Sequence, residues 1–186
     1  MANKIRYTFD AKASQFTVHA FASGLVAVVA HNPQFAIRDF SGEAQFISGT
    51  IEEAAVSVRI KAASLELMDE VSERDRREID RLTFGEVLEI KHFPEVVFKS
   101  TQISVNKVSE NLYGASITGS LVLHGIANNV SFPAQVVVGD DTLRAHGQFN
   151  VRQSDFGIET AAVAGGTLKM KDEVRIGFFI VARKQE

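Results

Sequence analysis

Apolar and polar residues alternate along most of the chain, most clearly between Tyr113 and Val138. The odd-numbered residues from Tyr113 to Leu123 are apolar or glycine, and serines and threonines separate most of them. From Val130 to Val138 the apolar residues fall on even numbers instead. A period of two is typical of a strand with one buried and one solvated face. Residues 124–129, between the two runs, are rich in glycine and asparagine, so the pattern predicts a β-hairpin that turns over this segment.

The same alternation predicts strands along the rest of the chain. They fall at residues 5–9, 16–20, 35–37, around 46, 54–62, 95–101, 103–108, 143–151 and 174–180. Residues 25–30 are apolar without interruption, and periodicity does not separate a strand from a helical turn there.

One segment shows helical signals instead. Ser72 is a helix-capping residue with an acid, Asp75, three positions later, and Ile79 then falls on one helical face with Leu82. Residues 83–86 carry a second capping signal, which predicts a separate short helix that ends before a proline at position 94. The fold class is therefore all-β, an antiparallel barrel of about eight to ten strands with one short helical insertion at about residues 72–92.

Composition and charge limit the function classes. The 186 residues suit a single domain spanning 1–186, and the net charge of −3 argues against nucleic acid as a partner. Cysteine is absent, which excludes disulfides and thiolate chemistry. No apolar run approaches the ~20 residues of a membrane span, so we expect no membrane-spanning helix. Because alternation begins at Ile5 with no apolar signal core before it, we expect a cytoplasmic protein, or a periplasmic one if a leader was trimmed.

Motifs for catalysis or metal binding are missing. The five histidines lie far apart, and there is no nucleophile elbow, phosphate-binding loop or dinucleotide fingerprint. We therefore predict no metal, no cofactor and no enzymatic activity. An enzyme that uses a pocket histidine with a nearby acid remains an alternative. His124 is interpreted as a turn histidine bonded to the backbone or as a group at a barrel mouth, and His31 as a buried, hydrogen-bonded histidine or a polar contact in a pocket.

Small residues are frequent on the face that the alternation assigns to the barrel interior. They are Ala20, Ala54, Ala62, Ala115, Gly119, Ala134, Ala145 and Gly147. A barrel of about eight strands has room either for filling side chains or for one small ligand. Two interpretations stay open: an empty cavity that holds a ligand, or an interior filled by the 14 phenylalanines. In the second case the protein would be an interaction module, with a homodimer formed through strand edges or residues 25–30.

Several stretches, in this order and spacing, resemble the YceI-like family. They are YTFDAKASQFTVHAF, AHNPQFAIRDFSGEAQF, RDRREIDRLTFGEVLEIKHFPEVVFKS, ITGSLVLHGIANNVSFPAQV, FNVRQSDFGI and DEVRIGFFIVA. The resemblance covers nearly the whole chain and implies a lipocalin-like barrel with a long apolar cavity. It also implies an amphiphile bound with its tail inside and its head group near the mouth.

On this basis we predict a non-enzymatic protein that sequesters a long-chain amphiphile, such as a polyisoprenoid, an isoprenoid quinone or a fatty acyl compound. The residues predicted to line the cavity are Val18, Ala20, Phe35, Ile37, Val56, Val58, Ile60, Ile117, Leu121, Leu123, Val136 and Phe149. His31, Arg38 and His124 are predicted to contact the head group.

Overall fold

The computed structural model describes residues 4–23, 32–47, 50–163 and 168–186. The strands are β1 (Lys4–Phe9), β2 (Gln15–His19), β3 (Ala22–Ser23), β4 (Gln34–Ile37), β5 (Phe40–Ile47), β6 (Thr50–Lys61), β7 (Leu65–Leu67), β8 (Glu95–Ser109), β9 (Leu112–Leu123), β10 (Ile126–Val138), β11 (Thr142–Arg152), β12 (Ala162–Val163), β13 (Leu168–Met170) and β14 (Glu173–Lys184). The helices are η1 (Ala62–Ser64), α1 (Glu73–Asp80), η2 (Arg81–Val87) and η3 (Gln153–Phe156).

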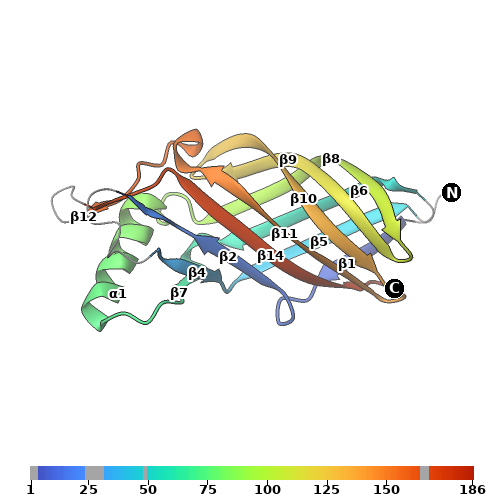
Figure 1. Ribbon diagram of the computed structural model, residues 1–186, viewed down its shortest axis with the longest axis horizontal. Helices are drawn as coiled ribbons and strands as arrows, with labels where there is room; N and C mark the ends of the chain where they lie inside the picture. Colours follow the sequence, from blue (N-terminus) through green and yellow to red (C-terminus); the bar gives the residue numbers. More distant parts are fainter. Residues whose placement is uncertain (1–3, 24–31, 48–49, 164–167) are drawn as a thin grey trace.

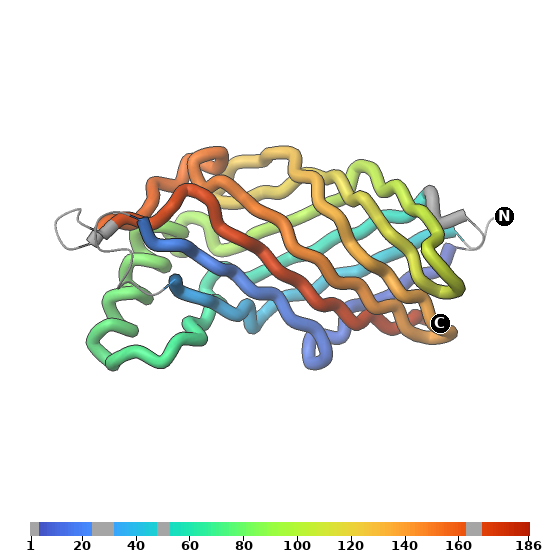
Figure 2. Tube along the Cα trace, in the orientation of Figure 1, coloured from blue at the N-terminus to red at the C-terminus, as the bar shows by residue number. Residues whose placement is uncertain are grey.

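Eight of these strands close into an antiparallel barrel, in the order β1-β5-β6-β8-β9-β10-β11-β14 and back to β1. This confirms the predicted fold class. Strand β14 completes the closure. One of its edges pairs with β11. The other edge pairs with β2 along the first half of the strand, as Phe178 with Phe16, and with β1 at its end, as Lys184 with Tyr7. The path from β1 into β2 therefore follows one side of β14 (Figure 2).

At one end the barrel wall is extended by the short strands β4 and β7, which continue the sheet beyond β2. The helix α1 lies at this end, far from the turn between β8 and β9 (Figure 1). A small three-stranded sheet of β3, β12 and β13 lies at the same end (Figure 1). The end that carries α1 is called the helical end below. No helix in the described part of the chain is long and apolar enough to cross a membrane.

The hairpin predicted from the central alternation is present as β9 and β10, and its odd-numbered residues face even-numbered partners, as at Ile117 and Phe132. The turn is shorter than predicted. It consists of His124 and Gly125, both with positive φ (53° and 74°), and β10 already begins at Ile126. A two-residue turn with two positive φ angles matches the twist of the flanking strands, so the asparagines that follow it can join the ladder.

Residues 95–109 form one strand, β8, rather than the two strands predicted there. The register of β8 against β9 shifts between Ser100 and Gln102, where Thr101 is an extra residue. An extra residue moves the inward face from even to odd numbers without ending the strand. The sequence pattern shows this change of phase, which was interpreted as a break.

Helix α1 runs directly into η2, so the helical insertion is one continuous helix and not the two helices predicted. Ser72 caps it as predicted: its Oγ accepts a hydrogen bond from the Asp75 amide at 3.1 Å and donates one to the Asp75 carboxylate at 2.7 Å. The second helix predicted to begin at Thr83 is absent. Thr83 lies inside the π-type turns of η2, where its carbonyl accepts from the amide of Leu88. Its backbone is therefore already helical and does not take the extended conformation of an N-cap residue.

Candidate functional site

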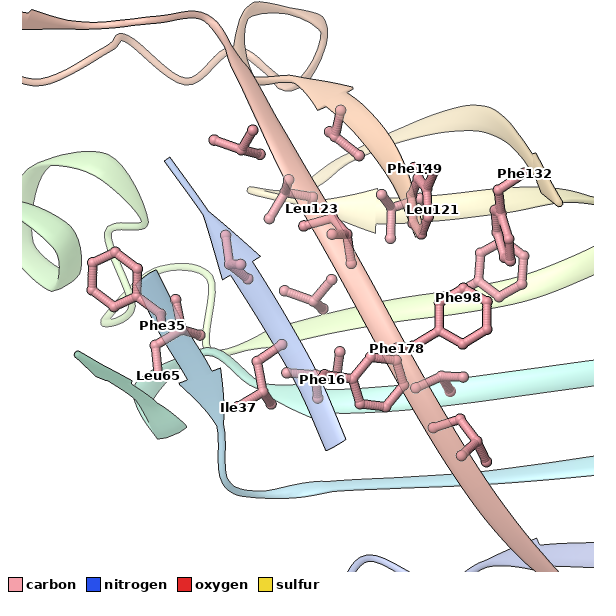
Figure 3. A pocket seen from close by; sticks show the side chains of 18 of the residues that line it. Phe16, Phe35, Ile37, Leu65, Phe98, Leu121, Leu123, Phe132, Phe149 and Phe178 are labelled. Atoms are coloured by element: carbon pink, nitrogen blue, oxygen red, sulfur yellow. The ribbon is translucent and has the colours of Figure 1, made fainter. Parts of the chain in front are cut away.

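The barrel encloses a cavity of about 700 Å³, which lies within the size range of small-molecule sites. Its wall consists mainly of aliphatic and aromatic side chains from the inward faces of the strands (Figure 3). Many inward side chains, among them Val56, Ile117 and Leu121, are only half-buried although they point into the barrel. They keep accessible surface because they face hollow space.

All twelve apolar residues predicted to line a cavity do lie along its wall: Val18, Ala20, Phe35, Ile37, Val56, Val58, Ile60, Ile117, Leu121, Leu123, Val136 and Phe149. The alternation was sufficient to place them because the phase of a strand assigns every second side chain to one face. Their contact with a ligand stays a prediction.

Four phenylalanines, of which only Phe149 was predicted as a site residue, form a cluster within the barrel. The ring of Phe132 lies 4.4 Å from that of Phe149, 5.4 Å from that of Phe98 and 5.7 Å from that of Phe178 (centroid distances), and Figure 3 shows these side chains together. All four line the cavity, and together they are called the aromatic cluster. The cluster narrows the barrel interior, so part of the volume is filled and part is hollow.

Glycines make room for two of these rings. A Cβ atom added to Gly119 would lie 2.6 Å from the Phe98 ring, and one added to Gly147 would lie 2.7 Å from the Phe178 ring. Among the small residues predicted to face inward, five alanines line the cavity: Ala20, Ala54, Ala62, Ala115 and Ala145. The two glycines and the buried Ala134 do not line it. The sequence left open whether the interior is an empty cavity or is filled by phenylalanines. Each interpretation applies to a different part of the interior.

Two of the three predicted head-group residues do not line the cavity. Arg38 follows the inward-facing Ile37, so its side chain points outward, where its Nε atom lies 2.8 Å from the Glu66 carboxylate. His124 is enclosed by other residues of the barrel rim. The third, His31, lies outside the described residues, as does the apolar run at 25–30.

His124 connects the hairpin turn to the segment that follows the helix. Its Nε2 atom lies 2.6 Å from the Glu89 carboxylate, its Nδ1 atom lies 3.3 Å from the Phe156 carbonyl oxygen, and its ring lies 4.3 Å from that of Phe93. The interpretation as a turn histidine that bonds the backbone is thus correct in part, because a carboxylate is its second partner. His124 thus connects Glu89 and Phe93 to the hairpin turn, and we expect these contacts to hold residues 88–93 against the barrel.

We expect His124→Asn to lower the free energy of unfolding by about 1–2 kcal/mol, because asparagine tolerates the positive φ but loses the bonds and the ring contact. Amide hydrogen exchange of residues 88–93 should accelerate. His146→Asn is the control, since His146 is exposed on the outer face of β11, and it should change stability by less than about 0.5 kcal/mol. Unchanged protection of residues 88–93 in His124→Asn would contradict this role.

Polar side chains reach the cavity mainly at the helical end. Asp69, Asp75, Glu78 and Thr83 come from the loop after β7 and from the helix, and Gln153 begins η3. The mixed charges of this helix were interpreted as a solvated face. Asp75 and Glu78 nevertheless share a helical face with two aliphatic lining residues, Ile79 and Leu82, and this spacing was the signal that could have placed them.

Most of these polar groups have partners within the protein. Arg81 donates hydrogen bonds to both oxygens of Glu78 at 2.8 and 3.0 Å, and these bonds hold the pKa of Glu78 below its usual range. The Asp69 carboxylate accepts a hydrogen bond from the backbone N–H of Gln34 at 2.7 Å. Gln153 is only 8% exposed, and its amide nitrogen donates to the Lys171 carbonyl at 3.1 Å. Among the described residues, no group of three or more His, Asp or Glu side chains could hold a metal ion.

Known proteins with the same architecture share this barrel. The sequence profile of the YceI-like domain matches residues 7–182. A UPF0312 protein of Pseudomonas putida (strain W619) is 29% identical over 139 residues, which cover 72% of this chain and 67% of that protein. The structure of BcnA from Burkholderia cenocepacia superimposes with a TM-score of 0.71 at 21% identity, over 93% of this chain and 98% of that one. A polyisoprenoid binding domain from Saccharophagus degradans, implicated in plant cell wall breakdown, gives 0.68 at 13% identity, over 96% and 98%.

Proposed function

Because the chain belongs to the YceI-like family, we propose that it is a binding protein that sequesters one long-chain amphiphile with its tail in the barrel cavity. The observation that carries the proposal is the cavity of about 700 Å³ with a predominantly apolar wall. Each CH₂ group buried there contributes about 0.8 kcal/mol, so a tail of a dozen or so carbons supplies ample affinity before the ordering costs. One structural neighbour is a polyisoprenoid binding domain, and this likeness supports an isoprenoid or similar chain as ligand.

The lining residues favour binding over catalysis. No histidine, lysine or arginine among the described residues lines the cavity, so none of these groups is placed there as the base of a nucleophile. The Ser72 hydroxyl bonds the lining carboxylate of Asp75, but both groups are used in the cap of the helix. A homodimer remains a separate proposal that gel filtration combined with light scattering can test.

Native mass spectrometry of the purified protein tests the proposed function. We expect a fraction of the molecules to carry an added mass that organic extraction removes, and the lipid-free protein to take up a fluorescent long-chain probe with saturable, single-site binding. Protein that carries no ligand and takes up no probe would overturn the proposal. Chemical conversion of the extracted compound on return to the protein would favour the enzyme instead.

Ala145→Phe should weaken probe binding strongly while changing the free energy of unfolding by less than about 1 kcal/mol. Ala145 packs against the buried core cluster that contains Leu143 and Ile180, but it is half-buried and lines the cavity, so we expect the added ring to extend into hollow space. We expect affinity for the probe to fall at least about tenfold, which corresponds to about 1.4 kcal/mol. Fluorescence titration measures the binding, and urea denaturation followed by circular dichroism measures the stability.

His146→Phe is the control, because it places a phenylalanine ring one residue later, on the exposed face of β11, in place of the imidazole ring. Binding should remain intact in this variant. Uptake by Ala145→Phe at the wild-type affinity would show that the probe does not occupy the barrel interior. A severe loss of stability would show that the position is packed rather than hollow.

A further inference from the structure

We propose that the ligand head group is a hydrogen-bond donor without negative charge, an alcohol or amine rather than a phosphate or carboxylate. This inference rests on the proposed function and adds the chemical class of the head group to it. It follows from the polar groups that the cavity wall presents at the helical end. These are the carboxylates of Asp69, Asp75 and Glu78, the hydroxyl of Thr83 and the side-chain amide of Gln153.

Gln153 is the buried member of this group. It is 8% exposed and lines the cavity, and its amide nitrogen is held by the Lys171 carbonyl. No described residue donates a hydrogen bond to its carbonyl oxygen. No side-chain oxygen or nitrogen of the described residues is fully buried without a partner. A ligand that filled the cavity would cover the Gln153 carbonyl oxygen, and burial of an amide carbonyl is costly unless a donor reaches it. A ligand hydroxyl or ammonium group in the cavity would supply that donor.

The carboxylates at the rim of the cavity also favour a head group that donates hydrogen bonds. Asp75 and Glu78 are exposed and Asp69 is half-buried, so they would meet a head group where the cavity opens toward solvent. A carboxylate accepts hydrogen bonds but donates none when ionised. An anionic head group would therefore meet like charge, whereas an ammonium group or an alcohol would find acceptors.

The neighbouring cations are already engaged and do not reverse this preference. Arg76 donates to the carbonyl oxygens of Leu67 and Asp69 at 3.0 and 3.1 Å. Arg81 is shared between Glu78 and Glu86. Neither arginine lines the cavity. Phosphate recognition in proteins typically uses arginine forks, lysines or backbone amides at a helix start, and no described cationic side chain is placed on the cavity wall for it.

The test compares four compounds with the same saturated hexadecyl tail: hexadecylamine, hexadecanol, heptadecanoate and hexadecyl phosphate. Each displaces a neutral fluorescent probe from the lipid-free protein at pH about 8, where the amine is protonated and both acids are ionised. We expect the amine and the alcohol to compete at concentrations at least about tenfold lower than the two anions. Equal or stronger competition by either anion would overturn the inference.

Two double variants with the same change in charge assign the effect to the cavity wall. Asp69→Asn/Glu78→Gln neutralises lining carboxylates, and Glu66→Gln/Glu86→Gln neutralises two carboxylates that do not line it although they bond Arg38 and Arg81. The first should reduce the ratio between amine and anion affinity several-fold, and the second should leave it unchanged. An equal effect of both variants would show that the preference follows the net charge of the protein. It would contradict the proposal that the carboxylates of the cavity wall contact the head group.

Gln153→Met tests the buried acceptor separately, because it keeps the size of the side chain and removes the amide. We expect the affinity for hexadecanol to fall several-fold relative to that for hexadecane, while thermal unfolding confirms a folded protein. An unchanged ratio between the alcohol and the alkane would remove Gln153 from the site. If neither the probe nor any tailed compound binds, the proposed function itself fails. If all tailed compounds bind equally, only the head-group inference fails.

Discussion

Replacing Phe132 by alanine is expected to lower the free energy of unfolding by about 3–5 kcal/mol, as for other large-to-small substitutions at packed aromatic positions. The ring is 9% exposed and contacts the rings of Phe98, Phe149 and Phe178. Its removal would separate the remaining three rings and join new volume to the cavity. Urea denaturation of the lipid-free protein, followed by circular dichroism, measures the loss.

Phe179→Ala is the control for this prediction. Phe179 follows Phe178 on β14 but is 45% exposed on the outer face, so its loss should cost less than about 1 kcal/mol. A second readout concerns the ligand: Phe132→Ala should bind probes with bulkier or longer tails better than the wild type does, because the narrowing by the aromatic cluster is removed. A small loss of stability, comparable with that of Phe179→Ala, would contradict a packed cluster within the barrel.

Gly119→Ala is expected to destabilise the protein by about 3 kcal/mol, although it adds one methyl group. The added Cβ would fall inside contact distance of the Lys99 carbonyl oxygen, 2.7 Å from the Ser100 Cα atom and 2.6 Å from the Phe98 ring. Two of these atoms belong to the backbone of the neighbouring strand β8, so a side-chain rotation does not relieve the contact. The transition midpoint in urea is the measurement.

Gly85→Ala is the matched control within the same chain. Gly85 lies in the helix η2, and nothing lies within 4 Å of the Cβ that alanine would add. Because alanine is the better helix former by about 0.5–1 kcal/mol, this variant should be as stable as the wild type or slightly more stable. A Gly119→Ala protein that unfolds at the wild-type urea concentration would mean that β8 and β9 can separate locally.

Much of the fold could be predicted from local pattern. The alternation on β9 and β10, the inward positions of Val56 and Val136, and the cap at Ser72 depend on neighbours along the chain or directly across a hairpin. The period of two assigns each side chain to a face without reference to distant strands. For this reason all twelve predicted apolar lining residues lie on the cavity wall.

The predicted strand break near Thr101 and the predicted helix start at Thr83 are wrong because each local signal is compatible with two structures. A change of phase near Thr101 is compatible with a strand break or with a bulge in one strand. Likewise, the capping signal at Thr83 was interpreted as a helix start, whereas the chain was already helical there. In both places the neighbouring elements decide, because they either maintain or end the hydrogen bonding.

The sequence by itself determined the barrel class, the inward face of the strands it predicted, and the absence of cysteine chemistry and of a charge surplus suited to nucleic acid. Only the tertiary structure decided which part of the interior is filled. Rings such as Phe98 and Phe178 pack over glycines of other strands, and no local pattern encodes that contact. Closure of the barrel likewise brings Gln153 and the carboxylates of the helix to one cavity, because residues distant in sequence become neighbours only when β14 joins β1 and β2.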